Sequence, residues 1–174
     1  AKRVRMRDHQ VRLLGTTTAP EAFVAGPFRP AIFVSRALLD VLDLEELEAV
    51  LLHEEHHRRT RAPLRGLALA CWSRLVGRLP AIRRWIDRRV AQLEIEADRY
   101  ALAAGASSAA MASALIKCDR SMSPTGIGFA SVADIRLRQL LGGGDPAHDP
   151  AAAPVEWLAP MLLALGLAAC HLFG

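Results

Sequence analysis

The chain has 174 residues, enough for one domain with a hydrophobic core but short for two. Hydrophobic residues make up 52% of it and aromatic residues 5%, so alanine and leucine supply most of the apolar content and favour helices. The net charge is +4, yet no aromatic residues are interleaved with the arginine clusters and no helix-turn-helix or zinc-finger spacing is present. We therefore expect no nucleic-acid partner.

The cysteines and the first residues bear on where the protein works. The three cysteines are far apart and include no C-x-x-C pair, so they predict neither a disulfide framework nor a thiolate metal site. The folded part of the chain is therefore expected to face a reducing compartment. No signal peptide is visible, and the chain opens with Ala1 in a basic stretch, as a piece excised from a longer protein would.

The beginning of the chain predicts a small β-structure and then a short helix. Residues 1–20 are basic and then rich in threonine, without strong periodicity. Residues 22–34 predict two short strands around a Gly-Pro turn. Ser35 is suited to cap a helix over residues 36–41.

Two further segments follow in the middle of the chain. Asp43 and Glu46 form a capping box ahead of an apolar face at helical spacing, which predicts a helix to about Arg58. Residues 64–79 are broadly apolar but are interrupted by arginines. They are too charged for an ordinary membrane-spanning helix and too apolar for a wholly solvated one.

The second half of the chain predicts more helices. A proline begins a helix over residues 80–104, and Gly105 is suited to end it. A further helix opens at one of two adjacent serines and ends near Cys118, and residues 119–130 are a predicted loop. The expected fold is mainly α with a small β-sheet, that is, α+β.

The end of the chain changes character. Ser131 caps a last soluble helix over residues 132–141, which completes a predicted domain over residues 1–141. Residues 142–154 form a linker of glycine, proline, aspartate and alanine, and residues 155–174 a hydrophobic segment. This last segment predicts a transmembrane helix that is clipped at its end, and we therefore expect the protein at a membrane.

The central motif is H-E-x-x-H, formed by His53, Glu54 and His57. Two histidines at i and i+4 lie one turn apart on a single helix face, so their imidazoles can bind one metal ion. Glu54 lies beside them and can take a proton from water activated by the metal. A solvated helix end rich in histidine and glutamate is the competing interpretation, but the apolar residues before His53 turn the motif toward the protein interior.

A second motif, E-x-x-x-D, supplies the third ligand that a zinc site needs. Glu94 and Asp98 lie one turn apart on the helix predicted over residues 80–104, so both can face the histidine helix. Glu94 would bind the metal, and Asp98 would accept a hydrogen bond from the far nitrogen of one histidine. The competing interpretation, an exposed acidic face paired with nearby arginines, loses force after H-E-x-x-H.

Together the two motifs resemble those of the membrane-embedded gluzincin peptidases. This group includes the CAAX prenyl protease, its bacterial stress-protease relatives and the peptidases of beta-lactam sensor-transducers. Residues 28–35, 48–54 and 59–64 are most similar to the sensor-transducer type, although Ala62 stands where that family usually has aspartate. The resemblance covers roughly residues 20–141.

The resemblance implies a zincin-like helical core, one Zn²⁺ per chain and a small sheet whose edge strand pairs with the substrate backbone. That edge strand would consist of Ala31, Ile32, Phe33 and Val34. The expected activity is hydrolysis of peptide bonds by an endopeptidase, with Glu54 as general base and a peptide or protein as substrate.

The resemblance also singles out Arg136, because residues 135–141 are similar to the family's R-I-x-x-L segment. Arg136 is therefore a candidate to support the site or the substrate carbonyl. Prenyl proteases have a histidine about six residues earlier, where this chain has Ala130. The residue that stabilises the oxyanion is left open among His56, Tyr100, Arg136 and His148.

Several functions remain open at this point. The chain can be an active endopeptidase, or a regulated signalling receptor module whose proteolysis inactivates a repressor or itself. A non-catalytic relative and a membrane-surface protein with an accidental motif are weaker alternatives. The arginine-rich residues 58–89 predict contact with an anionic cytoplasmic leaflet, with the peptidase domain on the cytoplasmic side. The sequence leaves the oligomeric state open.

Overall fold

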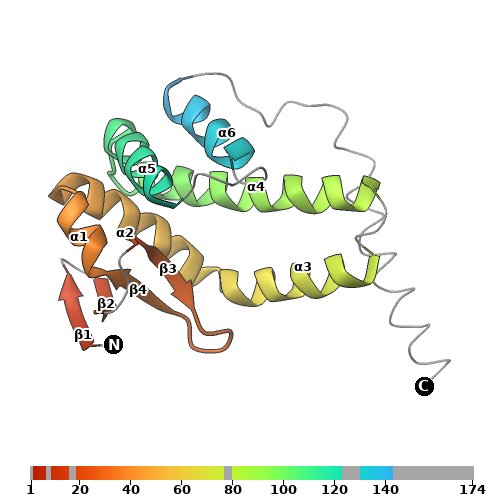
Figure 1. Ribbon diagram of the computed structural model, residues 1–174, viewed down its shortest axis with the longest axis horizontal. Coiled ribbons are helices and arrows are strands. Elements are labelled where there is room, and N and C mark those ends of the chain that lie inside the picture. The colour runs from red at the N-terminus through yellow and green to blue at the C-terminus, as the bar shows by residue number, and fades with distance from the viewer. Residues whose placement is uncertain (1, 7–8, 16–18, 77–79, 123–129, 143–174) are drawn as a thin grey trace. The chain divides into compact units, whose positions relative to one another are not determined.

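The computed structural model describes residues 2–6, 9–15, 19–76, 80–122 and 130–142 (Figure 1). These residues form a small mixed β-sheet and six helices, so the predicted α+β class is confirmed for this part of the chain.

The sheet contains β1 (Lys2–Met6), β2 (His9–Leu14), β3 (Ala22–Ala25) and β4 (Ala31–Ser35) in the order β1-β2-β4-β3. β1 pairs with β2 and β3 with β4 in antiparallel fashion, whereas β2 and β4 are parallel. The two strands predicted within residues 22–34 are confirmed. β1 and β2 fall where the sequence predicted no element.

Basic and apolar residues alternate along β1 with a period of two. Arg3 and Arg5 are exposed, whereas Val4 and Met6 are half-buried against the core. Alternating faces are what a strand produces, because successive side chains point to opposite sides of the sheet.

The prediction that residues 31–34 form the edge strand is wrong. β4 lies inside the sheet, where Ile32 pairs with Val11 of β2 on one side and with Val24 of β3 on the other. Both backbone edges of β4 are thus taken by neighbouring strands. Among the described strands, β3 is the outer strand next to β4.

The first two helices begin as predicted. The Ser35 hydroxyl accepts a hydrogen bond from the Leu38 backbone N–H at 3.1 Å and caps α1 (Arg36–Val41). The Asp43 carboxylate accepts bonds from two backbone N–H groups of the first turn of α2 (Leu44–Arg59), and the Glu46 carboxylate accepts one from the Asp43 N–H at 2.8 Å. This confirms the capping box and fixes the start of the helix that carries H-E-x-x-H.

The remaining helices are α3 (Ala62–Val76), α4 (Pro80–Ala103), α5 (Ser108–Met122) and α6 (Ala130–Leu140). Gly105 has a φ of 107° just after α4, a left-handed conformation that glycine adopts without steric cost, as predicted for this helix end.

Two boundaries differ from the prediction. α5 continues beyond Cys118, so the first residues of the predicted loop over 119–130 are helical. α6 begins at Ala130, so Ser131 lies in its first turn rather than ahead of it. Helix ends are the parts that local sequence signals define least well.

α2 is packed on two sides. Toward the sheet, Leu51 joins a buried cluster with Val11, Ile32, Val34 and Leu38. A second cluster joins α2 to α4, α5 and α6, and its buried members are Ala49, Ala101, Ala110, Met111, Ala112 and Leu140. The alanines let helix backbones approach closely, so α2 and α4 lie near enough for side chains from both to meet (Figure 1).

In the part of the chain that the structure describes, no helix is long and apolar enough to cross a membrane. The predicted hydrophobic segment 155–174 lies outside the described residues, as does the predicted linker 142–154 apart from its first glycine. Both remain predictions.

Candidate metal centre

The C-terminal half of α2 carries H-E-x-x-H into the protein interior. His53, Glu54 and Glu55 expose 6%, 8% and 6% of their surfaces, so three consecutive ionisable residues are buried. Buried ionisable groups are costly unless they are paired or bind a cation. The helix can bury them because the sheet covers one side of it and α4 the other.

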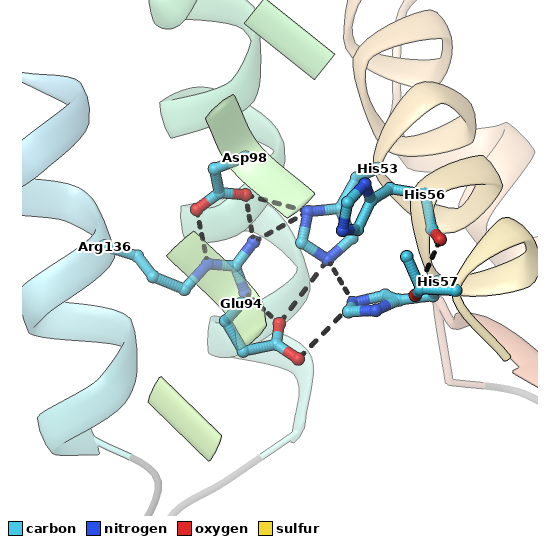
Figure 2. Close-up of polar contacts among 7 residues, drawn as sticks. His53, His56, His57, Glu94, Asp98 and Arg136 are labelled. Atoms are coloured by element: carbon cyan, nitrogen blue, oxygen red, sulfur yellow. Dashed lines mark hydrogen bonds and ion pairs between the residues drawn. The ribbon is translucent and has the colours of Figure 1, made fainter. Parts of the chain in front are cut away.

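Three donor groups from α2 and α4 meet at one point (Figure 2). His53 Nε2 lies 3.0 Å from His57 Nε2 and 3.4 Å from Glu94 Oε2. His57 Nε2 lies 3.4 Å from Glu94 Oε1. One donor atom from each of the three residues lies within 4.8 Å of the others.

These separations fit a single metal ion. Ligand atoms placed about 2.0–2.1 Å from a tetrahedral ion lie roughly 3.3 Å from one another. The observed separations run from 3.0 to 3.4 Å when each histidine is measured to a different oxygen of Glu94. Two imidazoles and one carboxylate are also a donor set that leaves a fourth position open for water or substrate.

Asp98 fixes the orientation of His53. Its Oδ1 lies 2.8 Å from His53 Nδ1, and the aspartate itself is 3% exposed. In a neutral imidazole this contact keeps the proton on Nδ1, so the lone pair of Nε2 points to the position between the donors. Asp98 lies one turn after Glu94 on α4, the spacing from which the sequence predicted this role.

We expect Asp98→Asn to weaken metal binding by about 10–100-fold while the fold stays intact, because carboxylate partners of metal-binding histidines contribute on that scale. A competition titration against a chromogenic chelator measures the change. Glu96→Gln, an exposed change on the same helix, is the matched control. Equal affinities of Asp98→Asn and the control would show that Asp98 does not act through His53.

Arg136 reaches the site from α6. Its guanidinium donates two hydrogen bonds to Asp98, from Nε to Oδ2 and from Nη2 to Oδ1, both at 2.8 Å. A third runs from Nη1 to Glu94 Oε2 at 3.2 Å (Figure 2). One rigid planar group thus holds the carboxylates of Glu94 and Asp98 in place.

The ionisable groups of the site stabilise one another's charged forms. Burial opposes a charge on His53, but its hydrogen bonds with Asp98 and Glu94 outweigh burial and raise its pKa to about 9. Burial likewise opposes ionisation of Glu94, yet His53 and His57 hold the pKa of that carboxyl far below its ordinary range. Burial opposes ionisation of Asp98 too, but His53 and Arg136 lower the pKa of its carboxyl below the ordinary value.

Glu54 differs from the other carboxylates at the site. Burial raises its pKa above the ordinary value, against the attraction of His53 and His57. A carboxylate whose pKa is raised toward pH 7 is a stronger base than a solvated carboxylate. Glu54 thus follows His53 directly in the chain and is buried with a raised pKa.

Glu55 belongs to a separate network that sequence reasoning only partly anticipated. Its buried carboxylate accepts hydrogen bonds from Arg58 and Arg59 at 2.7 and 2.8 Å, and it lies 3.9 Å from His9 Nδ1 on β2. The predicted pairing with an arginine is present, but the contact with β2 depends on a strand that the sequence did not reveal. The Glu55 carboxylate thus pairs with two arginines of α2 and lies near β2.

This network predicts a pH-dependent effect on stability. Hydrogen bonds from Arg58, working against burial, lower the pKa of Glu55 from 4.5 to about 2. A depressed pKa stabilises the folded state above pH 4.5, and this contribution is lost as pH falls toward 2. We expect Glu55→Gln to cost about 1–2 kcal/mol at pH 7, since both arginines are partly solvated.

Urea unfolding of the wild type and Glu55→Gln at a series of pH values measures this difference. The gap between the two should close as the pH is lowered from 5 toward the acid limit of folding. A gap that stays constant with pH would mean that the variant acts through packing, not charge.

Two of the other residues left open for oxyanion stabilisation, His56 and Tyr100, belong to the described part of the chain. The rings of His56 and Tyr100 contact each other, with centroids 5.2 Å apart, and the Arg59 guanidinium lies over the Tyr100 ring at 5.6 Å. His56 thus packs against α4 beside the donors. His148 lies outside the described residues.

Comparisons with known proteins agree with this geometry. Residues 1–79, which include H-E-x-x-H, match the sequence model of Peptidase family M48. The chain is also 33% identical over 87 residues to a protease HtpX homolog of Aquifex aeolicus (strain VF5). That match covers 49% of this chain and 28% of the relative, so the chain spans less than a third of the protein that it resembles. Both similarities are to peptidases.

Proposed function

We propose that the chain is the catalytic part of a zinc-dependent endopeptidase. The observation that carries the proposal is the convergence of His53, His57 and Glu94, with one donor atom from each within 4.8 Å of the others. The similarity of residues 1–79 to a peptidase family supports it independently of the geometry.

The residues divide the work among themselves. A zinc ion held by His53, His57 and Glu94 would polarise the scissile carbonyl and acidify water. Glu54 takes a proton from the attacking water as its oxygen bonds to the carbonyl carbon, and passes that proton to the amine nitrogen as the C–N bond breaks. Asp98 and Arg136 keep His53 and Glu94 in position throughout.

β3 offers a way to hold an extended substrate. It is the outer strand of the described sheet beyond β4, and it contacts α2, the helix that carries H-E-x-x-H. A peptide that adds to its free edge would gain backbone hydrogen bonds without a demand for particular side chains. We propose β3 in place of β4 as the strand that pairs with substrate.

Arg136 is proposed to act through Glu94 and Asp98. Its guanidinium donates hydrogen bonds to these two carboxylates, which supports a positioning role more than direct contact with the substrate carbonyl. We further propose that the protein works at a membrane, with this domain on the cytoplasmic side, because the arginine-rich residues 58–89 match the charge bias of that side.

Removal and return of zinc test the proposed activity. Cleavage of an unfolded protein such as casein should stop when a strong chelator removes the metal and should recover when stoichiometric zinc, but not magnesium, is returned. Cleavage that persists in the metal-free, folded protein would rule out the proposed mechanism.

A further inference from the structure

The helix α3 exposes an apolar stripe that no described element covers. Leu64 and Leu67 expose 38% and 54% of their surfaces, and Ala68 and Cys71 are exposed as well. These four residues follow the spacing i, i+3, i+4, i+7, so they lie on one face of the helix and form what we call the α3 stripe.

The opposite side of α3 is the one that packs on the protein. The helix contacts α2, α4 and β3 and runs out beside α4 (Figure 1). Leu69 and Ser73, which lie roughly opposite the α3 stripe at about 100° per residue, are partly buried. The α3 stripe therefore points away from the folded body.

Positive charge borders the α3 stripe on both sides. At about 100° per residue, Arg65 lies on one side of the stripe and Arg74 on the other, and both are exposed. α3 contains no acidic residue. The neighbouring helix α4 adds the exposed arginines Arg83, Arg84 and Arg88 against one exposed acid, Asp87, in the same stretch.

This combination fits the surface of an anionic lipid bilayer. Leucine side chains can enter the boundary between headgroups and acyl chains, while arginines beside them reach the phosphates with their long stems. A second copy of the chain fits less well, because a two-fold contact through the stripe would bring arginines of one copy close to arginines of the other.

We propose that the α3 stripe docks α3 on an anionic membrane surface, with the leucines inserted and the arginines on lipid phosphates. This contact is separate from the chemistry of the metal centre and needs no proteolytic activity. This inference rests on the membrane location proposed above, and the contact would set the orientation of the catalytic domain relative to the lipid.

Cys71 provides a probe at the centre of the α3 stripe. In the full chain, Cys118→Ala and Cys170→Ser leave Cys71 as the single thiol, which is labelled with an environment-sensitive fluorophore such as NBD. The label is observed in buffer, with phosphatidylcholine vesicles, and with vesicles that also contain phosphatidylglycerol. The control protein has the same two substitutions and Cys71→Ser. Its label is attached at Ala104→Cys, an exposed position after α4.

With anionic vesicles, we expect a blue shift and loss of quenching by aqueous iodide at Cys71 but not at the control position. Leu67→Glu should abolish the shift, whereas Leu44→Glu, which changes a 71% exposed leucine at the start of α2, should not. Each of Arg65→Gln and Arg74→Gln should weaken vesicle binding of the stripe about fivefold. Because these side chains are exposed, the variants should keep the wild-type circular dichroism spectrum.

Three outcomes would overturn the proposal. If the chain sediments with vesicles while the Cys71 label stays in water, another segment binds the lipid. An equal blue shift with neutral vesicles would show that the arginines do not contribute to binding. A shift without vesicles that grows with protein concentration would assign the stripe to a second copy of the chain.

Discussion

Replacing Glu54 by glutamine should lower peptide cleavage by about 10²–10⁴-fold while zinc binding stays close to that of the wild type. Glutamine keeps the size of the side chain and removes only its ability to take a proton. The donors His53, His57 and Glu94 are unchanged, so the metal should remain. Cleavage of a fluorogenic peptide, measured with the metal content of the same samples, gives both quantities.

Glu45→Gln is the matched control for this variant. Glu45 is an exposed glutamate in the first turn of the same helix, and its side chain takes no part in the site. If Glu54→Gln cleaves as fast as this control, Glu54 is not the general base and another group must accept the proton.

The second large effect concerns Glu94. Glu94→Gln should weaken zinc binding by more than 100-fold, because this residue supplies one of three donors and the only negative charge among them. The loss of zinc affinity should exceed that of Asp98→Asn, because Asp98 contacts the ligand His53 and would not bind the metal itself. Chelator competition measures the affinity, and thermal unfolding of both metal-free proteins shows whether the change damages the fold.

Asp87→Asn, an exposed change on α4, serves as the control for the loss of one negative charge from that helix. Near-equal zinc affinities of Glu94→Gln and Asp87→Asn would exclude Glu94 as a ligand. The metal-free Glu94→Gln variant should also lose some stability, because Arg136 and His53 each lose a charged partner.

The features that the sequence predicted well are those in which interacting groups are close along the chain. The Ser35 cap and the box of Asp43 and Glu46 are formed by groups three residues apart, so their residue types alone predict the hydrogen bonds. The spacing of His53 and His57 belongs to the same class, because four residues on a helix return to the same face.

Features that depend on distant segments were beyond local patterns. The parallel pairing of β2 with β4 joins residues about twenty apart and puts β4 inside the sheet, so the edge strand could not be identified from the sequence of residues 31–34. A short apolar strand has the same pattern whether one or both of its edges are paired.

The candidate metal centre depends both on local spacing and on contacts between distant segments. E-x-x-x-D placed Glu94 and Asp98 on one helix face, but their distance from His53 is set by the packing of α4 on α2 through small side chains such as Ala49 and Ala101. The two hydrogen bonds that Arg136 donates to Asp98 depend in addition on where α6 packs, which no spacing within residues 130–140 encodes.

The most direct test of the central claim is the metal content of the purified wild-type chain after dialysis against metal-free buffer. We predict about one zinc per chain by elemental analysis, and close to none in the double variant His53→Ala/His57→Ala with the same circular dichroism spectrum. A well-folded wild-type chain that takes up no zinc even when zinc is supplied would contradict the assignment of His53, His57 and Glu94 as a metal centre.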